Sequence, residues 1–355
     1  MGSRSVVLLS HTHRHGDFVV GSHHLARELA GMGWRVAHVS TPYSVPHRLA
    51  GRGSRGRREG AARGATLADD GVVDLVPATV LPAPACSVRR LSHLLADLGF
   101  ASPDLVLLDQ PKLARLADRL GGRGPVVYRP TDLYTGRLAR RAQTSALRVA
   151  DLVVATSTPI LDDIGPLRVP AICVENGVEF RRFAGAAPAE GNGVVYLGAL
   201  DHRFAWSDLA ALAAAHEGVP FRIYGPVPRD VPPLPGNVLL LGPVPYADVP
   251  TVLSTARVGL LPLTDRPENA GRSPMKLYEY LAAGLHVLAS RTPVTGRLAP
   301  VIHTYGTPDE AAGLLAGLLL APRNTEGQVV AREQDWGVKA REVVRFALGT
   351  DAQLL

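Results

Sequence analysis

The sequence predicts an α/β fold of two doubly wound domains in series, which face each other across a cleft. Three observations predict it. Short runs rich in valine and leucine alternate with helix-like segments; the unpatterned stretch FRRFAGAAPAEGN, residues 180–192, interrupts this alternation as a linker; and the alternation then starts again. Such alternation is typical of parallel sheets with helices on both faces. We expect a first domain over residues 1–182, a second over residues 183–335, and a terminal helix over residues 336–355 that packs back toward the first domain.

The first half of the chain contains the runs that define the first domain. The expected strands are Ser5–Ser10, Arg35–Ser40, Val72–Val76, Leu105–Asp109, Val126–Arg129, Leu152–Ala155 and Ala171–Val174. The expected helices are Phe18–Met32, Ser87–Leu98, Lys112–Leu120 and Gly136–Ala150. In open α/β sheets, ligands bind at the carboxyl ends of the strands, so polar residues that follow these strands are candidates for a site.

The second half repeats the pattern. The expected strands are Val194–Leu197, Pro220–Tyr224, Val238–Leu241, Val258–Leu261, His286–Ala289 and Val301–His303. The expected helices are Trp206–His216, Tyr246–Ala256, Pro274–Ala283, Pro308–Leu320 and Trp336–Leu348.

The composition favours a soluble or peripheral protein of a reducing compartment. Apolar residues make up 46% of the chain, and no run approaches the ~20 apolar residues that cross a bilayer. The two cysteines, Cys86 and Cys173, cannot form a disulfide framework, which points to the cytoplasm.

Most of the positive charge is carried by arginine, and six arginines lie between Arg48 and Arg63 in the stretch RLAGRGSRGRREGAARG. With interleaved glycines and no aromatic residues, this stretch is interpreted as a mobile basic loop. Contact with anionic lipids at the inner face of a membrane, or with a phosphorylated acceptor, is the alternative. A nucleic-acid partner is not expected, because no recognised binding module accompanies the arginines.

The stretch NAGRSPMKLYEYLAAGLHVLAS, residues 269–290, carries the strongest functional signal. Ser273 suits an N-cap and Pro274 the first helical position. Lys276 then opposes the positive end of the helix dipole, and a bound diphosphate would explain a cation there. Glu279, one turn further, could accept hydrogen bonds from ribose hydroxyls. The alternative is an ordinary helix with a Lys–Glu surface pair.

These residues carry a resemblance. The segments VVYLGALDHRF, PGNVLLLGPVPYADVPTVLSTARVGLLPL and the Lys276–Glu279 helix resemble the nucleotide-sugar-binding domain of GT-B glycosyltransferases, and ENGVEFRRF resembles their interdomain junction. The chain is similar to the xanthan glucuronosyltransferase and teichuronic-acid-type group, and more distantly to the retaining glycosyltransferase family 4. The resemblance implies two Rossmann-like domains and a nucleotide-sugar donor. The donor-binding residues that it implies are Gly198, Arg203, Tyr224, Arg272, Ser273, Pro274, Met275, Lys276, Leu277 and Glu279.

The sequence departs from the retaining group in two places. That group has two glutamates with seven residues between them, whereas Gly271 stands where the first would precede Glu279. It also carries an Arg and a Lys after the first strand of the second domain, where this chain has Ala199 and Phe204. Arg203 or Arg272 is expected to supply the missing charge.

VVYRPTDLYTG, residues 126–136, is similar to the segment of the glucuronosyltransferase group whose aspartate acts as a base. This similarity implies Asp132 as the general base that takes the proton of the acceptor hydroxyl. The alternative is that Asp132 caps a helix. Asp109, at the end of another strand, is the reserve candidate on the acceptor side of the cleft.

The stretch HTHRHGD, residues 11–17, follows the first strand. We expect His15 to be a catalytic residue, with His13 and Gly16 beside it on the acceptor side. A metallohydrolase is the rival interpretation, but His15 stands where the aspartate of the His-x-His-x-Asp-His motif belongs, and no second cluster of metal ligands follows.

The sequence therefore predicts a cytoplasmic glycosyltransferase that moves a sugar from a nucleotide-diphosphate sugar, most readily a UDP-sugar, to a hydroxyl of a glycan, a lipid-linked or a natural-product acceptor. We expect it to need no metal ion or other cofactor. A nucleotide-sugar 2-epimerase or hydrolase, and a binding protein that has lost its chemistry, are the alternatives on the same fold.

Overall fold

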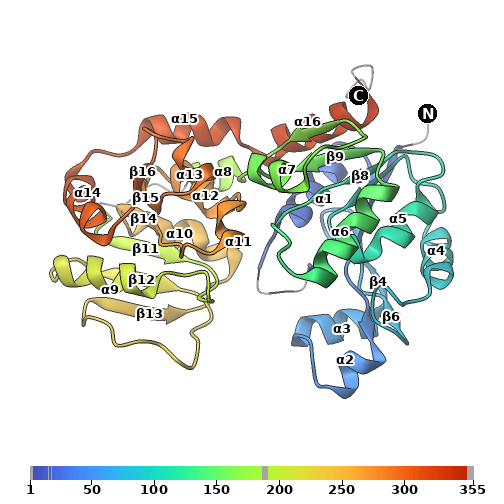
Figure 1. Ribbon diagram of the computed structural model, residues 1–355, viewed down its shortest axis with the longest axis horizontal. Helices are drawn as coiled ribbons and strands as arrows, with labels where there is room; N and C mark the ends of the chain where they lie inside the picture. Colours follow the sequence, from blue (N-terminus) through green and yellow to red (C-terminus); the bar gives the residue numbers. More distant parts are fainter. Residues whose placement is uncertain (1–2, 15, 17, 186–190, 350–355) are drawn as a thin grey trace. The chain divides into compact units, whose positions relative to one another are not determined.

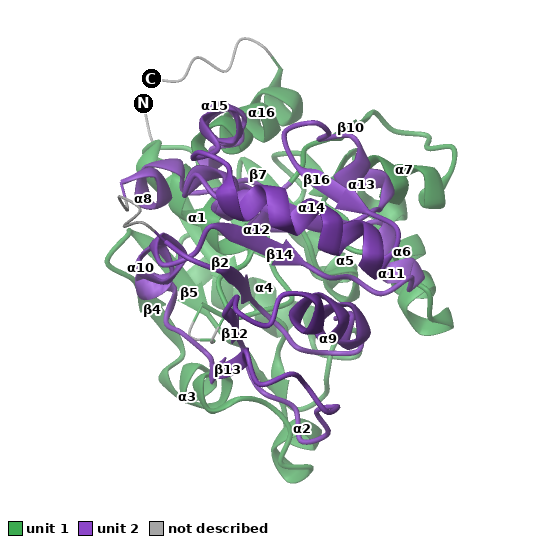
Figure 2. Ribbon diagram, turned by 90° about the vertical axis from the view of Figure 1, so that its left-hand side faces the viewer, with its two compact units in different colours: residues 1–175, 337–355 green, residues 176–336 purple. Residues whose placement is uncertain are grey.

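A computed structural model describes residues 3–14, 16, 18–185 and 191–349 of the chain (Figure 1). The chain divides into two compact units (Figure 2). Unit 1 contains residues 1–175 and 337–355, and unit 2 contains residues 176–336.

Unit 1 is built around an eight-stranded sheet in the order β10-β9-β8-β7-β1-β2-β5-β4. Its strands pair in parallel except for β4, which is antiparallel to β5. These strands are β1 (Ser5–Leu9), β2 (Arg35–Val39), β4 (Ala65–Leu67), β5 (Val72–Leu75), β7 (Leu105–Leu108), β8 (Val126–Tyr128), β9 (Leu152–Ala155) and β10 (Ala171–Cys173). A separate two-stranded sheet pairs β3 (Tyr43–Ser44) with β6 (Ala78–Thr79).

Most helices of unit 1 lie between these strands in the sequence, and α16 follows unit 2. They are α1 (Gly21–Gly31), α2 (Val45–Leu49), α3 (Arg55–Arg63), α4 (Val88–Asp97), α5 (Ala114–Leu120), α6 (Arg137–Val149), α7 (Thr158–Ile164) and α16 (Trp336–Leu348), with a 3₁₀ turn at Pro111–Leu113. Every residue of β1 and β7 is buried, which explains why both strands are continuous apolar runs rather than alternating ones.

Unit 2 holds a six-stranded sheet in the order β13-β12-β11-β14-β15-β16, and all its strand pairs are parallel. The strands are β11 (Val194–Leu197), β12 (Phe221–Tyr224), β13 (Val238–Gly242), β14 (Val258–Leu261), β15 (His286–Ser290) and β16 (His303–Tyr305). The helices are α8 (Phe180–Ala184), α9 (Trp206–Ala215), α10 (Val249–Ser254), α11 (Pro267–Ala270), α12 (Met275–Ala282), α13 (Pro293–Gly296), α14 (Pro308–Leu320) and α15 (Thr325–Glu333), with a 3₁₀ turn at Tyr246–Asp248.

Each sheet has one point where the strand order reverses. In unit 1 the chain builds outward from β1 through β2 to β5, and then from β7 through β8 and β9 to β10 on the other side. In unit 2 the reversal falls between β11 and β14. Because ligands of open α/β sheets bind at such points, the loops after β1, β7 and β11 are where a site is expected.

The unit borders differ from the domain borders expected from the sequence. The expected borders were residues 182/183 and 335/336, whereas the units change at 175/176 and 336/337. The segment that follows Asn176 is hydrogen-bonded inside unit 2: the backbone N–H of Val178 donates to the carbonyl of Gln334 at 3.0 Å, and that of Phe180 donates to the Asp335 carboxylate at 3.1 Å. These bonds place residues 176–182 in unit 2.

The interpretation of the basic stretch as a loop is wrong for much of its length. Residues 55–63 form α3, and residues 45–49 form α2. The Ser54 hydroxyl accepts the backbone N–H of Arg57 at 3.3 Å and caps α3. Glu59 forms ion pairs with Arg55 at 2.7 Å and Arg63 at 3.3 Å, one helical turn before and after it. These local contacts offset the weak helix propensity of the glycines.

In the part of the chain that the structure describes, no helix is both long enough and apolar enough to cross a bilayer.

Candidate functional site

The amino end of α12 in unit 2 lies against the carboxyl end of β11. Gly198, directly after β11, has a φ of 147°, and a Cβ atom there would stand 2.2 Å from Lys276 Cε and 2.4 Å from Lys276 Nζ. The Lys276 ammonium lies 5.5 Å from the centroid of the Tyr196 ring. The missing side chain of Gly198 therefore leaves room for Lys276 beside the end of the strand, so two of the predicted donor-binding residues are neighbours.

Positive charges gather around Lys276. Desolvation lowers the pKa of its ammonium, and the charges of Arg272 and Arg203 lower it further, while the Glu279 carboxylate acts in the opposite direction. Among the described residues, no acceptor forms a hydrogen bond with this half-buried ammonium. A bound anion would relieve both the desolvation and the mutual repulsion of the cations.

Arg203 is partly engaged by a neighbour. Its guanidinium donates to the Asp201 carboxylate at 2.5 to 3.1 Å. Desolvation acts to raise the pKa of Asp201, yet the hydrogen bonds and charge of Arg203 lower it. Of the two arginines expected to supply the missing charge, Arg203 thus shares its charge with a carboxylate.

Glu279 lies one turn along α12 and is 8% exposed. Desolvation raises the pKa of its carboxyl, Lys276 opposes this rise, and the Glu179 carboxylate adds to it. Tyr246 lies near both glutamates, and Arg182 lies over its ring at 5.2 Å. The sequence prediction did not include Glu179 or Tyr246; the ENGVEFRRF segment was the signal that could have indicated the first of them.

Ser273 does not cap α12, contrary to expectation. The N-cap position is Pro274, the helix begins at Met275, and no side chain of the described residues caps it. The Ser273 hydroxyl instead accepts the backbone N–H of Asn176 at 3.0 Å, and its carbonyl accepts the Asn176 side-chain amide at 2.8 Å. Asn176 is a further neighbour of the site that sequence reasoning missed.

Two predicted donor-binding residues, Leu277 and Tyr224, pack in or against the hydrophobic core around α12. Leu277 is buried in the core cluster around α12, and Tyr224, at the end of β12, packs against the same cluster. The carbonyl of Tyr224 accepts the backbone N–H of Gly198 at 2.9 Å, so Tyr224 supports the loop through its backbone.

Gly198→Ala should displace Lys276 without unfolding unit 2. The new Cβ would collide with the flexible end of the lysine, and a positive φ costs an alanine about 1–3 kcal/mol. We expect the Kd for UDP, measured by isothermal titration calorimetry, to rise about tenfold, which is one good charge-assisted hydrogen bond. Gly218→Ala, where nothing lies within 4 Å, is the control. Unchanged UDP affinity in Gly198→Ala would show that Lys276 does not bind the diphosphate.

In unit 1, Asp132 lies in the loop after β8. It does not cap a helix, because α6 begins at Arg137 with Gly136 as its N-cap residue. The Thr131 hydroxyl donates to its carboxylate at 3.4 Å. His11, in the loop after β1, is close enough that the Asp132 carboxylate acts on its pKa, which desolvation lowers overall. His11 was not among the predicted residues, although its place directly beyond the first strand could have indicated it.

Asp109 follows β7 and supports the loop rather than facing the acceptor as expected. It is 2% exposed and forms a double hydrogen bond with Arg129, at 2.9 Å from Nε and 2.5 Å from Nη2. Both oxygens of this buried carboxylate accept hydrogen bonds from the guanidinium fork, so neither is free to act as a base. The sequence did not reveal this pair because its members are twenty residues apart.

The histidine-rich stretch divides between described and undescribed residues. His15 lies outside the described residues. His13 is 9% exposed, and its Nε2 lies 3.0 Å from the Ser54 hydroxyl, the residue that caps α3. Gly16 has His13 Cε1 as its nearest neighbour, at 3.4 Å from a Cβ built on it. The structure thus gives His13 a contact that ties the loop to α3, and its expected place on the acceptor side stays a prediction.

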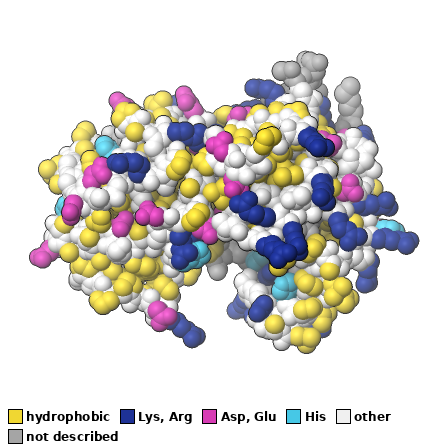
Figure 3. All heavy atoms as spheres, in the orientation of Figure 1, with side chains coloured by type: hydrophobic (Ala, Val, Ile, Leu, Met, Phe, Trp, Pro, Cys, Tyr) yellow, Lys and Arg dark blue, Asp and Glu magenta, His cyan; other side chains and the backbone are white. Residues whose placement is uncertain are grey.

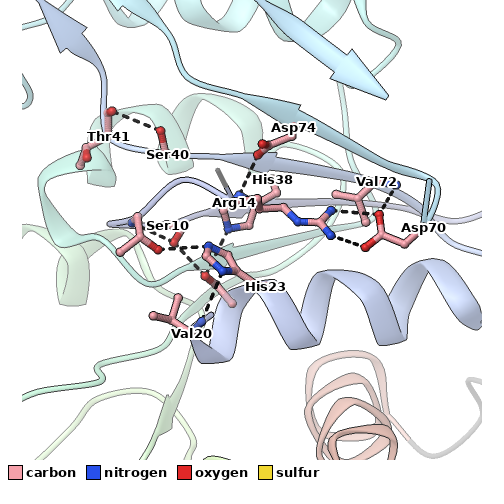
Figure 4. A network of polar contacts seen from close by, with 12 residues as sticks. Ser10, Arg14, Val20, His23, His38, Ser40, Thr41, Asp70, Val72 and Asp74 are labelled. Carbon is pink, nitrogen blue, oxygen red and sulfur yellow. Dashed lines mark hydrogen bonds and ion pairs between the residues drawn. The ribbon is translucent and has the colours of Figure 1, made fainter. Parts of the chain in front are cut away.

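A buried polar network lies under this loop (Figure 4). His38 contacts Asp74 through Nδ1 at 3.2 Å and the Ser22 hydroxyl through Nε2 at 3.2 Å, and Ser22 contacts Ser10 at 2.8 Å. At most 2% of any of these residues is exposed, so this Ser-His-Asp order cannot reach a substrate. It ties α1 to β1, β2 and β5.

His23 holds both ends of the same loop. The backbone N–H of Val20 donates to His23 Nδ1 at 3.3 Å, which leaves Nε2 to donate to the Thr12 hydroxyl at 3.1 Å. Desolvation, with His38 as the next cause, holds the pKa of His23 far below its usual range. The ring is therefore neutral, as the acceptor role of Nδ1 requires.

Within the described residues, no group of three or more His, Cys, Asp or Glu side chains is arranged to hold a metal ion.

Comparisons with known proteins agree with the fold, and the family profile matches most of unit 2. Residues 207–337 match the family profile described as glycosyl transferase-like. A putative teichuronic acid biosynthesis glycosyltransferase, TuaH of Bacillus subtilis strain 168, is 25% identical over 241 residues. The alignment covers 60% of each chain, so this chain matches about 60% of the length of that curated relative.

Solved structures match almost the whole chain. A glycosyltransferase from Rickettsia africae ESF-5 has a TM-score of 0.69 at 11% identity, covering 99% of this chain and 100% of that one. Anabaena Alr3699/HepE in complex with UDP-glucose has a TM-score of 0.67 at 16% identity, covering 96% and 98%. At these identities the likeness shows the fold.

The chain has the GT-B fold of two Rossmann-like domains, and residues 207–337 are similar to the glycosyl transferase-like family. Within that class it is similar to the teichuronic acid biosynthesis protein, the group that the Lys276 and Asp132 segments had indicated.

Proposed function

We propose that this protein transfers a sugar from a nucleotide-diphosphate sugar of the UDP class to a hydroxyl group of an acceptor. The observation that carries the proposal is the place of the Lys276 ammonium. It lies in the space left by Gly198 at the amino end of α12, near Arg272 and Arg203, with no acceptor bonded to it among the described residues. A diphosphate is the anion that such a cluster fits.

The donor half of the mechanism follows from this cluster. The backbone amides of Met275 and Lys276 are at the start of a helix without a side-chain cap, so they can donate to diphosphate oxygens. As the bond from the anomeric carbon to the diphosphate breaks, negative charge grows on the leaving oxygen, and Lys276 stabilises it. Glu279, whose carboxylate has no hydrogen-bond donor among the described residues, would accept the ribose hydroxyls.

The acceptor half is assigned to unit 1. The acceptor oxygen attacks the anomeric carbon while its proton passes to the Asp132 carboxylate, which a single displacement with inversion requires. Asp132 follows β8 in the loop region at the carboxyl ends of the strands, near His11, and it is not engaged as a helix cap. The buried ion pair of Asp109 and Arg129 lies at the ends of β7 and β8 and stabilises this region. No metal ion takes part in these steps.

The donor class is supported by what is bound in proteins of the same fold. Structures of Anabaena Alr3699/HepE contain UDP or UDP-glucose, and an Escherichia coli trehalose-6-phosphate protein contains UDP-2-fluoro glucose. An acceptor in cell-surface glycan synthesis is supported by the name of the Bacillus relative.

A thermal-shift series with UDP, GDP and dTDP, each with and without EDTA, tests the proposal. At a hundredfold excess over Kd, a bound nucleotide adds about 2.7 kcal/mol of stability, which raises the Tm by several degrees. We expect UDP to give the largest shift and EDTA to leave it unchanged. Turnover of a UDP-sugar without acceptor would indicate an epimerase or hydrolase instead. Stabilisation by zinc alone would indicate a metallohydrolase and overturn the proposal.

A further inference from the structure

A groove of about 830 Å³ opens on unit 1 between α2, α3, β6 and α4. None of the residues that line it belongs to the candidate site described above. Its walls are mostly apolar, with Leu81, Leu91 and Leu94 among them. Cavities of this size with apolar walls and a few polar groups are typical of ligand sites rather than of packing defects.

The rim of the groove exposes large apolar side chains to solvent. Val80 is 64% exposed, Leu81 is 49% exposed, and Leu94 is 37% exposed. Leu49, the last residue of α2, lies next to the lining residue Arg48 in the chain and is 80% exposed. Soluble proteins rarely gather apolar side chains in this way except where something covers them. Figure 3 shows hydrophobic and basic side chains close together in this lower part of unit 1.

The charged residues of the lining indicate the chemistry of the ligand that covers these apolar side chains. Arg48, Arg58 and Arg90 line the groove, and its lining contains no acidic residue. Within the described residues, no carboxylate forms an ion pair with any of these three arginines. The contrast with Arg55 and Arg63, which Glu59 pairs on the same helix, shows that the groove side of α3 has been left without counter-charge. The ligand is therefore anionic at one end and apolar along its length.

We propose that this groove binds an anionic phospholipid of a bilayer, with an acyl chain in the groove and the phosphate on Arg48, Arg58 and Arg90. The exposed side chains of Leu49 and Val80 then enter the interface of the membrane, where apolar side chains are favoured. A nucleic acid fits less well, because the only aromatic residue in the lining, Tyr43, is 9% exposed and stacked on His47. This inference does not depend on the proposed sugar transfer.

Vesicle co-sedimentation of the full chain, without nucleotide, tests it. The vesicles are pure phosphatidylcholine, phosphatidylcholine with 30 mol% phosphatidylglycerol, and phosphatidylcholine with 2 mol% of a polyprenyl phosphate. The variants are Arg48→Gln/Arg58→Gln/Arg90→Gln and Leu81→Ser/Leu94→Ser. The control Arg168→Gln/Arg229→Gln/Arg341→Gln changes the net charge equally at exposed positions outside the groove. Far-UV circular dichroism and the Tm of each variant without ligand show whether it is folded.

We expect wild type and the control to bind the phosphatidylglycerol vesicles and to leave phosphatidylcholine vesicles unbound. The triple groove variant should lose about 100-fold in vesicle affinity, since each basic residue near an anionic surface contributes about fivefold. The leucine variant should also weaken binding, and 0.5 M salt should reduce it for wild type. Equal losses in the control, or no binding by wild type, would overturn the proposal. Binding that needs the polyprenyl phosphate, with none to phosphatidylglycerol, would also overturn it and assign the groove to a lipid acceptor.

Discussion

Lys276→Ala should weaken UDP binding by about 10- to 100-fold, because the variant loses a charge-assisted interaction with the diphosphate that is worth about 1.5–3 kcal/mol. Transfer should fall at least as far, and by up to 10³-fold, since the same ammonium stabilises the charge that grows on the leaving group. Calorimetric Kd values for UDP and uridine, with initial rates of transfer, measure both effects. Uridine affinity should stay the same, because uridine carries no phosphate.

Lys112→Ala removes the same charge from an exposed position in unit 1 and serves as the control. If Lys276→Ala weakened UDP and uridine equally, the loss would come from a disturbed unit 2 rather than from the diphosphate. In that case the role of Lys276 would be refuted, and the Lys–Glu pair would be an ordinary feature of α12.

Asp132→Asn should slow transfer by 10²- to 10⁴-fold, which is the usual contribution of a general base, and should leave the affinity for UDP unchanged. The amide keeps the size of the side chain but cannot take up the acceptor proton. Initial rates at saturating donor and acceptor, together with a UDP titration, separate the two expectations. Asp69→Asn, at an exposed position of the same unit, should match wild type in both measurements. Equal rates for Asp132→Asn and wild type would exclude Asp132 from the chemistry.

The parallel strands could be predicted from the sequence because buried strands of an α/β sheet are short apolar runs bounded by turns. Most of the predicted strands agree with the structure to within a residue or two. β16 was placed two residues early, because the single Val301-Ile302 pair in a short stretch gives no clear period. The α3 helix was missed because its glycines lower its propensity, and the Ser54 cap and the Glu59 pairs that stabilise it outweigh that cost.

The part of the candidate site around Lys276 could be predicted because a short local pattern in the sequence pointed to it. A lysine at the positive end of a helix is unfavourable by itself, which pointed to an anion, and the structure places that lysine against Gly198. Contacts between distant segments gave no such signal. Asn176 binds Ser273 from 97 residues away, and His13 reaches Ser54 across 41 residues. Only the folded chain shows that Ser273, Asp109 and His13 are already engaged by partners.

The isolated β-bridge between Val178 and Asp335 has a consequence for how this protein can be divided into fragments. Unit 2 is one continuous segment inserted into unit 1, and this bridge pairs residues close to its two ends. A module whose ends already meet can be excised, or moved into another host chain, without stretching either terminus. We therefore expect residues 176–336 to fold as a separate fragment, in which the proposed nucleotide binding can be measured apart from the acceptor, and we expect a short linker to close the gap that they leave in unit 1.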